Sequence, residues 1–270
     1  MNPNKVLWEK GDFTKIASTM RDSGEELVAS LGVKKGMKVL DLGCGDGNTA
    51  IPFARTGADI IGVDIAQNLV DAGNERARKE GLGNIRFFEG DAADLNGQKD
   101  GEFDLTFSIF GAMFASNPFK VANEMVRVTK KGGKIIMGNW IPNDPTLVAQ
   151  ILKISSAYTP PPPEGFISPM TWGVEKNVIE RFGAAGIPEE KISFERALFI
   201  FRAPYSPKEY VSVFKNFYGP TMNAFDAAAK NDKSDELQKE LEDLFNKHNT
   251  SASTDKTEIT AAYLKVTVQC

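Results

Sequence analysis

Residues 39–49 read VLDLGCGDGNT, and this segment sets the architecture of the 270-residue chain. Apolar residues lead into an acid, Asp41, and glycines then come at every second position. A short apolar run that ends in glycines is typical of a buried parallel strand that turns tightly into a helix, without a Cβ in the way of a ligand. We therefore expect a ligand at the carboxyl end of this strand.

The sequence on either side alternates between predicted strands and helices. Strands are predicted over 38–42, 60–64, 85–88, 103–110, 134–138, 192–202 and 259–268. Helices are predicted over 13–31, with a polar break at Asp22-Ser23-Gly24, and over 68–80, 118–128, 145–157 and 174–185, while residues 206–249 are helical without a strand. The predicted apolar face of helix 118–128 holds Phe119, Ala122, Met125 and Val126. Alternation at this pitch indicates right-handed βαβ units around a parallel sheet.

Composition and charge argue against several classes of protein. The net charge is −4 and the lysine pairs at 34–35 and 130–131 fit solvated loop tips, so we expect no nucleic-acid partner. Two cysteines and a single histidine, His248, predict neither a disulfide framework nor a metal site nor a Ser–His–Asp hydrolase. The chain has no apolar run near membrane-spanning length and no apolar leader at its start, so we expect a cytoplasmic protein without a membrane partner.

The spacing and charge of the glycine segment discriminate between ligands. A dinucleotide site favours G-x-G-x-x-G, whereas here Asn48 stands where the third glycine would be. The acid at Asp41 would repel a diphosphate but suits a ligand with a positive end. S-adenosylmethionine carries an ammonium and a sulfonium, so Asp41 and the bare backbone of Gly43 and Gly45 fit its methionyl half. An NAD(P)-dependent oxidoreductase is the disfavoured alternative.

Two further acids end the next two predicted strands. Asp64 is placed to accept hydrogen bonds from ribose hydroxyls, and Asp91, beside Ala92, is placed to accept one from an adenine amino group. Each aspartate alone could equally be a helix cap or a turn residue. Three acids at the carboxyl ends of successive strands make coincidence a poor explanation.

With these residues in place, the chain resembles the class I S-adenosylmethionine-dependent methyltransferases, especially the small-molecule type related to the ubiquinone/menaquinone-biosynthesis enzymes. The resemblance covers residues 36–140 closely and the terminal strands weakly. It implies a doubly wound, Rossmann-like sheet of seven mostly parallel strands, the last antiparallel, with helical lid insertions. It also implies S-adenosylhomocysteine as the product. The fourth strand lacks the Asn/Asp-Pro-Pro-aromatic signature of enzymes that methylate base amines.

The resemblance implies a role for each matching position. The loop from Asp41 to Gly47 would cradle the methionyl group, and the segment Ser108-Ile109-Phe110 would contact that group and face the acceptor. The expected donor-binding residues are Asp41, Gly43, Cys44, Gly45, Asp64, Ile65, Asp91, Ala92 and Ser108.

The chain is predicted to be a single methyltransferase domain over 1–270. Residues 33–140 form its donor-binding half, and 141–190 and 205–257 are insertions that cover the acceptor pocket. The four prolines at 160–163 are either a stiff spacer or a rim of that pocket. The apolar stripe of residues 237–245 packs either on the sheet or on a second copy, so the sequence leaves the oligomeric state open.

Aromatic and sulfur-bearing side chains are the candidates for an acceptor pocket, although core packing is the better explanation for any single one of them. The expected pocket residues are Trp8, Phe13, Phe110, Met113, Phe114, Trp140 and Trp172, and the candidate catalytic residues are Tyr158, Tyr205 and Tyr218. Methyl transfer to a small molecule by in-line displacement needs mainly alignment and exclusion of water. A non-catalytic protein that binds the donor remains an alternative, as does a protein or RNA methyltransferase. The sequence identifies neither the acceptor nor a general base.

Overall fold

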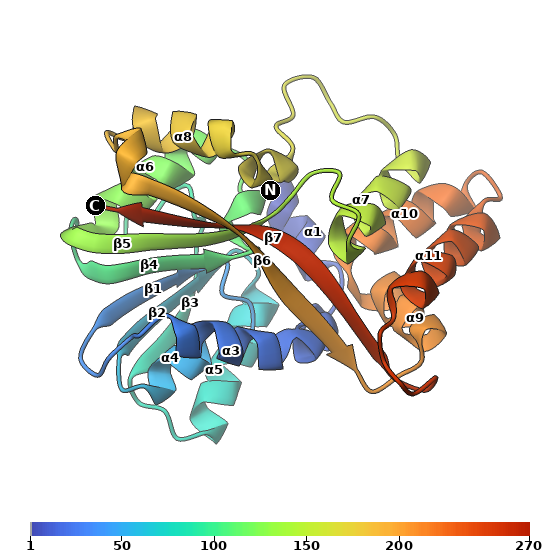
Figure 1. Ribbon diagram of the computed structural model, residues 1–270, viewed down its shortest axis with the longest axis horizontal. Helices are drawn as coiled ribbons and strands as arrows, with labels where there is room; N and C mark the ends of the chain where they lie inside the picture. The colour runs from blue at the N-terminus through green and yellow to red at the C-terminus, as the bar shows by residue number, and fades with distance from the viewer. Residues whose placement is uncertain (1) are drawn as a thin grey trace.

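The computed structural model describes residues 2–270, which form a seven-stranded sheet with helices on both faces (Figure 1). The strands lie in the order β3-β2-β1-β4-β5-β7-β6. Their bounds are β1 Lys38–Leu42, β2 Asp59–Asp64, β3 Ile85–Glu89, β4 Phe103–Ile109, β5 Thr129–Trp140, β6 Ile192–Ala203 and β7 Thr257–Gln269. Neighbours from β3 to β5 are parallel, and β7 runs antiparallel to both β5 and β6. The predicted fold class is confirmed.

Helices cover the sheet because each turns an apolar face toward it. One face of the sheet is covered by α6 (Pro118–Val128) and α8 (Glu175–Ala184), the other by α3 (Arg21–Ser30), α4 (Ala50–Arg55) and α5 (Gln67–Lys79) (Figure 1). Phe119 is 39% exposed, so the prediction that places it on the apolar face of α6 is wrong. The buried face of α6 is instead formed by Val121, Ala122, Met125 and Val128, which lie on one side of the helix because helical neighbours recur every three to four residues.

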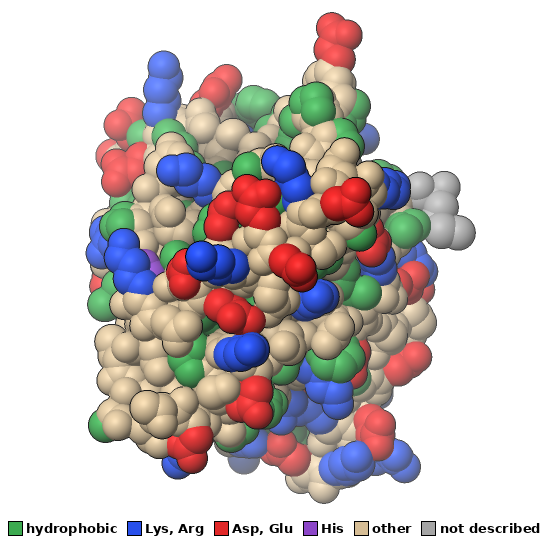
Figure 2. Space-filling model, turned by 90° about the vertical axis from the view of Figure 1, so that its right-hand side faces the viewer, with side chains coloured by type: hydrophobic (Ala, Val, Ile, Leu, Met, Phe, Trp, Pro, Cys, Tyr) green, Lys and Arg blue, Asp and Glu red, His purple; other side chains and the backbone are tan. Residues whose placement is uncertain are grey.

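Four further helices pack on one another at the side of the molecule that lies to the right in Figure 1. They are α7 (Leu147–Tyr158), α9 (Pro207–Phe217), α10 (Gly219–Ala229) and α11 (Ser234–His248). The apolar stripe of α11 is buried, and α11 packs on α7 and α9 rather than mainly on the sheet. Basic and acidic side chains are interspersed over the outer face of this helical layer (Figure 2).

The N-terminal helices differ from the sequence prediction. Helix α1 (Pro3–Glu9) was not predicted, and the predicted helix 13–31 is α2 (Thr14–Ala17), a 3-10 turn η1 (Ser18–Met20) and α3. The expected break at Asp22-Ser23-Gly24 is wrong, because these residues lie inside α3, where Ser23 contacts β6. The Ser23 hydroxyl donates to the Ile200 carbonyl (3.0 Å) and accepts from the Ile200 amide (3.1 Å), which satisfies the edge of β6.

No helix within residues 2–270 combines the length and the apolar character needed to cross a membrane.

Candidate functional site

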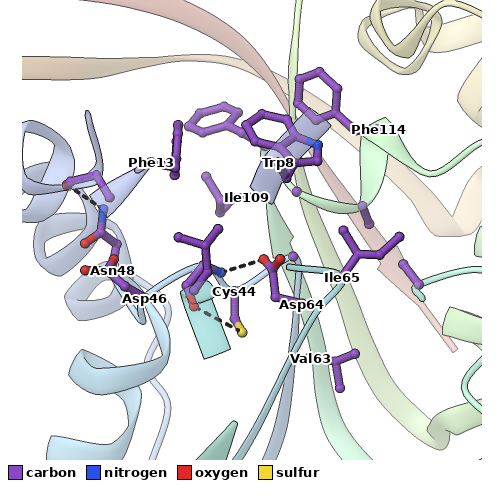
Figure 3. A pocket seen from close by; sticks show the side chains of 18 of the residues that line it. Trp8, Phe13, Cys44, Asp46, Asn48, Val63, Asp64, Ile65, Ile109 and Phe114 are labelled. Atoms are coloured by element: carbon purple, nitrogen blue, oxygen red, sulfur yellow. Dashed lines mark hydrogen bonds between the residues drawn. The ribbon is translucent and has the colours of Figure 1, made fainter. Parts of the chain in front are cut away.

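A pocket opens at the carboxyl ends of the strands, where β1 and β4 lie side by side and the strand order reverses. Loops after β1, β2 and β3 line one half of it. The loop after β4 and the end of β6 line the other half, and α1, α2 and η1 cover it. In the close view, Trp8, Phe13 and Phe114 lie on the opposite side of the pocket from Asp46 and Asp64 (Figure 3). The pocket is therefore built from segments that are far apart in the chain.

The glycine turn after β1 touches the loop after β4 directly. A Cβ built on Gly43 would fall 2.4 Å from the Cα of Gly111, and a Cβ on Gly111 would fall 2.5 Å from the Cα of Gly43. The Ser108 hydroxyl ties the same two segments by donating to the Leu42 carbonyl (2.7 Å) and accepting from the Ala112 amide (2.9 Å). Ser108 is fully buried and does not line the pocket, contrary to its expected contact with the donor.

Gly45 presents open backbone to the pocket. Its φ is +54°, and a Cβ there would meet no atom within 4 Å. Its amide donates to Asp64 Oδ2 (2.8 Å), while the Ala66 amide donates to Asp64 Oδ1 (2.9 Å). These bonds fix the Asp64 carboxylate at the wall of the pocket, although burial raises its pKa. Ile65 lines the pocket beside it.

Asp41 does not line the pocket. Its carboxylate is 1% exposed and accepts a hydrogen bond from Thr49 Oγ1 (2.6 Å). Burial, only partly offset by this bond, raises the pKa of Asp41 to about 7. The expected direct contact with a cationic headgroup is therefore not what the structure shows, because Thr49 lines the pocket in its place.

Two residues that the sequence analysis did not select lie at the wall of the pocket within the same segment. Asp46 is 2% exposed and forms ion pairs with Arg21 (2.9 Å) and Arg76 (3.3 Å). The side-chain Nδ2 of Asn48 donates to the Ala17 carbonyl (2.8 Å). Asp46 Oδ1 and Asn48 Oδ1 are buried with no hydrogen-bond partner among the described residues. The sequence signal that could have identified Asp46 and Asn48 is their position inside the glycine segment.

Helix α1 is fastened over the third strand end. Asp91 accepts hydrogen bonds from Asn2 Nδ2 (3.1 Å) and from the Ala93 amide (2.9 Å), and Ala92 lines the pocket next to it. Asn4 Nδ2 donates to the Phe114 carbonyl (2.7 Å), which ties α1 to the loop after β4. The N-terminal segment thus bridges the two halves of the pocket, a role that the sequence pattern did not reveal.

Aromatic rings form the half of the pocket beyond β4. Trp8 packs edge-on against Phe13 (5.5 Å between ring centroids) and Phe114 (5.0 Å). Phe110 has a φ of +60° and stacks on Trp140 at 3.5 Å with an angle of 9° between the ring planes. Trp8, Phe13, Phe110 and Phe114 line the pocket, whereas Trp140 supports Phe110 from behind.

Besides Trp140, which is buried behind Phe110, two more of the expected acceptor residues lie outside the pocket lining. Met113 is 1% exposed and belongs to the core. Trp172 is also buried, with the Arg181 guanidinium 4.5 Å from its ring centroid and Phe182 6.1 Å away. Neither lines the pocket, because the 3-10 turn that carries Trp172 (η3, Pro169–Gly173) packs toward α8 and β5.

None of the three candidate tyrosines is among the described residues that line the pocket. The Tyr158 hydroxyl donates to Glu240 (2.8 Å) between α7 and α11, and its pKa is raised to about 12 by desolvation and by this carboxylate. The ring of Tyr205 packs near Tyr210 (6.2 Å). Tyr218 lies behind Trp8 and Phe13, and burial raises its pKa. Within residues 2–270, none of these three hydroxyl groups therefore lines the pocket.

Charge is distributed unevenly within the pocket. The carboxylates of Asp46, Asp64 and Asp91 follow β1, β2 and β3, so all three lie on one side of the β1–β4 junction. The half beyond β4 is lined mainly by apolar and aromatic side chains, and no Lys, Arg or His occurs in the described lining.

Comparison with known proteins gives consistent results. A family model described as a methyltransferase domain matches residues 33–175. An uncharacterized protein of Mycobacterium tuberculosis is 33% identical over 84% of this chain and 80% of its own length. A demethylmenaquinone methyltransferase of Paenarthrobacter aurescens is 34% identical over 42% of this chain and 43% of its own.

Solved structures share the fold. The YcgJ protein of Bacillus subtilis superposes with a TM-score of 0.58 at 20% identity, over 92% of this chain and 99% of its own. A putative methyltransferase of Bacillus halodurans gives a TM-score of 0.57 at 15% identity, over 92% and 98% of the two chains.

Proposed function

This chain belongs to the S-adenosylmethionine-dependent methyltransferases, and from that premise we propose that it methylates a small-molecule acceptor held in the pocket at the β1–β4 junction. S-adenosylmethionine is the methyl donor of this family, and its sulfonium supplies an activated methyl group. The observation that carries the proposal is the division of one pocket into a carboxylate-bearing half and an aromatic half. A donor with polar ends and an apolar acceptor require such a division.

The residues after β1, β2 and β3 fit the donor. The lining turn Gly43-Cys44-Gly45 suits the methionyl group, since a Cβ at Gly45 would occupy otherwise empty space. The unpartnered oxygens of Asp46 and Asn48 suit a ligand that brings N–H donors to this turn.

The second and third strand ends complete the donor site. Asp64, with Ile65, would hold the ribose hydroxyls, and Asp91, with Ala92, would hold the adenine. Asp41 does not line the pocket and would instead position Thr49 through their hydrogen bond.

The aromatic half fits the acceptor. Trp8, Phe13, Phe110 and Phe114 would orient an apolar molecule and exclude water, which is most of what an in-line methyl transfer needs from a protein. Helix α1 and η1 cover this half, so a small molecule enters more readily than a folded protein or a nucleic acid. The segments 141–190 and 205–257 supply none of the described lining residues. They would cover the pocket indirectly, because α10 packs on α1 and α9 packs on α2.

Calorimetric titration tests the proposal. Wild-type protein is expected to release heat with S-adenosylmethionine and with S-adenosylhomocysteine, but not with NADH. The Asp64→Asn variant should bind both adenosyl ligands at least about 10-fold more weakly, because a charge-assisted hydrogen bond is lost. Asp71→Asn, on the exposed face of α5, is the matched control and should bind like the wild type.

The outcomes separate the alternatives. Folded wild-type protein that gives no heat with either adenosyl ligand would refute the proposal. Binding without turnover, in a screen that follows release of S-adenosylhomocysteine with small-molecule acceptors, would support the non-catalytic alternative.

A further inference from the structure

The sheet topology separates the charges of the pocket from its aromatic rings. The three lining carboxylates follow β1 to β3, whereas Phe110 follows β4 and Phe199 belongs to β6, on the other side of the junction. If the donor occupies the first half, as proposed above, the acceptor meets the second. The chemistry of that second half then limits the class of acceptor.

A permanent negative charge on the acceptor has no counterpart there. The described lining offers no Lys, Arg or His. Arg21 and Arg76 are paired with Asp46 on the donor side, and Lys5 of α1 is paired with Glu89. A carboxylate or phosphate buried without a partner loses its hydration and gains nothing in exchange. An acceptor without a permanent anion is therefore favoured.

The aromatic half also has no proton-accepting side chain among the described lining residues. The titratable lining residues are Cys44 and the three aspartates, all on the donor side, and each aspartate already accepts hydrogen bonds or ion pairs. Burial raises the pKa of Cys44, and Tyr218 lies behind the lining rings with its pKa raised as well. The acceptor must therefore bring a nucleophile that needs no base from the protein.

A thiol meets this requirement, whereas an alcohol or a phenol does not. The thiol of cysteine, with a pKa of about 8.5, is a few per cent thiolate at neutral pH, and a thiolate is intrinsically a strong nucleophile, whereas a phenol such as that of tyrosine has a pKa of about 10. A thiolate also turns a cationic donor and an anionic nucleophile into two products without charge at the reacting sulfurs. An alkyl amine, with a pKa of about 10.4 as in lysine, is almost wholly ammonium at neutral pH and has no lone pair for the attack, and the described lining of the aromatic half offers no base to remove its proton.

We propose that the acceptor is a small, apolar thiol with no permanent charge, an inference that rests on the proposed function. The thiol gives its proton to solvent, and its sulfur forms a bond to the methyl carbon. The bond between that carbon and the sulfonium breaks, and its electron pair stays on the sulfur of S-adenosylhomocysteine. Phe110, held by its stack on Trp140, would support the apolar body of the thiol.

Four probes with one scaffold test the class, each with saturating S-adenosylmethionine: phenylmethanethiol, phenylmethanol, phenylmethanamine and 4-(mercaptomethyl)benzoate. Phenylmethanethiol should exceed each of the other three probes in kcat/KM by about 100-fold. The alcohol and the amine lack a nucleophile that is available at neutral pH, and the carboxylated thiol would bury one unpaired charge. The pH profile of kcat/KM should rise to the pKa of the free thiol. It should move when a thiol of lower pKa is used, because no enzyme base is titrated.

Binding provides a readout that does not depend on turnover. Protein saturated with S-adenosylhomocysteine should bind benzyl methyl sulfide, the product, at least about 10-fold more tightly than its para-carboxylated analogue. Ala115 lines the aromatic half and is partly exposed, so Ala115→Lys places a cation there. This variant should gain about 10-fold toward both carboxylated probes, whereas Ala115→Gln, of similar length without charge, should not.

Each outcome decides the inference. Preference for the alcohol, the amine or the carboxylated thiol overturns it, as does a protein that binds the donor but turns over neither thiol. Equal affinity for the two sulfides also overturns it, even if Ala115→Lys fails to fold. If wild-type protein gives no heat with the donor, the proposed function fails too, and the calorimetry distinguishes that case.

Discussion

The buried carboxyl of Asp41 makes the stability of the fold depend on pH in a way that a single substitution can remove. Its pKa is 3.8 in ordinary surroundings and about 7 in the folded chain, because burial disfavours the charged form. The folded state therefore holds the proton more tightly than the unfolded state does, and stability falls as pH rises from 3.8 toward 7. Above the folded pKa the loss is complete, since both states are then ionised.

The size of the effect follows from the two pKa values. Between about pH 5.5 and pH 7 the unfolded carboxyl is ionised and the folded one is protonated, so each pH unit costs about 1.4 kcal/mol. Asp41 should thus cost the fold about 2 kcal/mol between about pH 5.5 and pH 8. Asp41→Asn keeps an acceptor for Thr49 but has no charge to bury, so the variant should gain about 2 kcal/mol on the wild type over this range.

Urea unfolding at the two pH values, at constant ionic strength, measures this difference. Asp104→Asn on β4 is the matched control. Hydrogen bonds from Lys130 and from the Lys38 amide lower the pKa of Asp104 despite its partial burial. Asp104 is therefore ionised in both states throughout the window, and its removal should give the same difference at both pH values. If Asp41→Asn also gives a pH-independent difference, the assignment of a buried, proton-holding carboxyl at this position is wrong.

Three further substitutions probe the packing around the site. Ser23→Ala leaves both backbone groups at the edge of β6 without their partner and should lower the free energy of unfolding by about 1–3 kcal/mol, with no change in pH dependence. Gly111→Ala places a Cβ 2.5 Å from the Cα of Gly43, backbone against backbone. It should cost about 1–3 kcal/mol and weaken binding of S-adenosylhomocysteine, and an unchanged melting temperature with unchanged binding would contradict the close approach. Tyr158→Phe should leave turnover within about 2-fold of the wild type, because its hydroxyl only bridges α7 and α11 and such exposed bonds contribute little. A loss of about 100-fold in kcat would reinstate this tyrosine as a catalytic group.

The carboxylate-bearing half of the pocket could be located from the sequence because it depends on strand order and local spacing. In a parallel sheet the carboxyl ends of neighbouring strands meet at one edge, so Gly43, Asp64 and Asp91 come together once their strands are recognised. Two signals can be read along the chain. Glycines come at every second position after an apolar run, and acids stand at the ends of the predicted strands. These signals require no knowledge of how distant segments pack.

Tertiary packing alone decided which side chains reach the pocket from elsewhere. Asp41 lies behind Thr49 because β1 is buried on both faces. The indole of Trp172 turns toward α8, although an indole would also suit an aromatic pocket. Trp8 reaches the pocket because α1 is tied to the loop after β4 through Asn4, over a separation of 110 residues. Aromatic side chains stabilise a core and an acceptor pocket by the same burial of apolar area. The residue type therefore cannot distinguish a core position from a pocket position, and only the placement of the helices does.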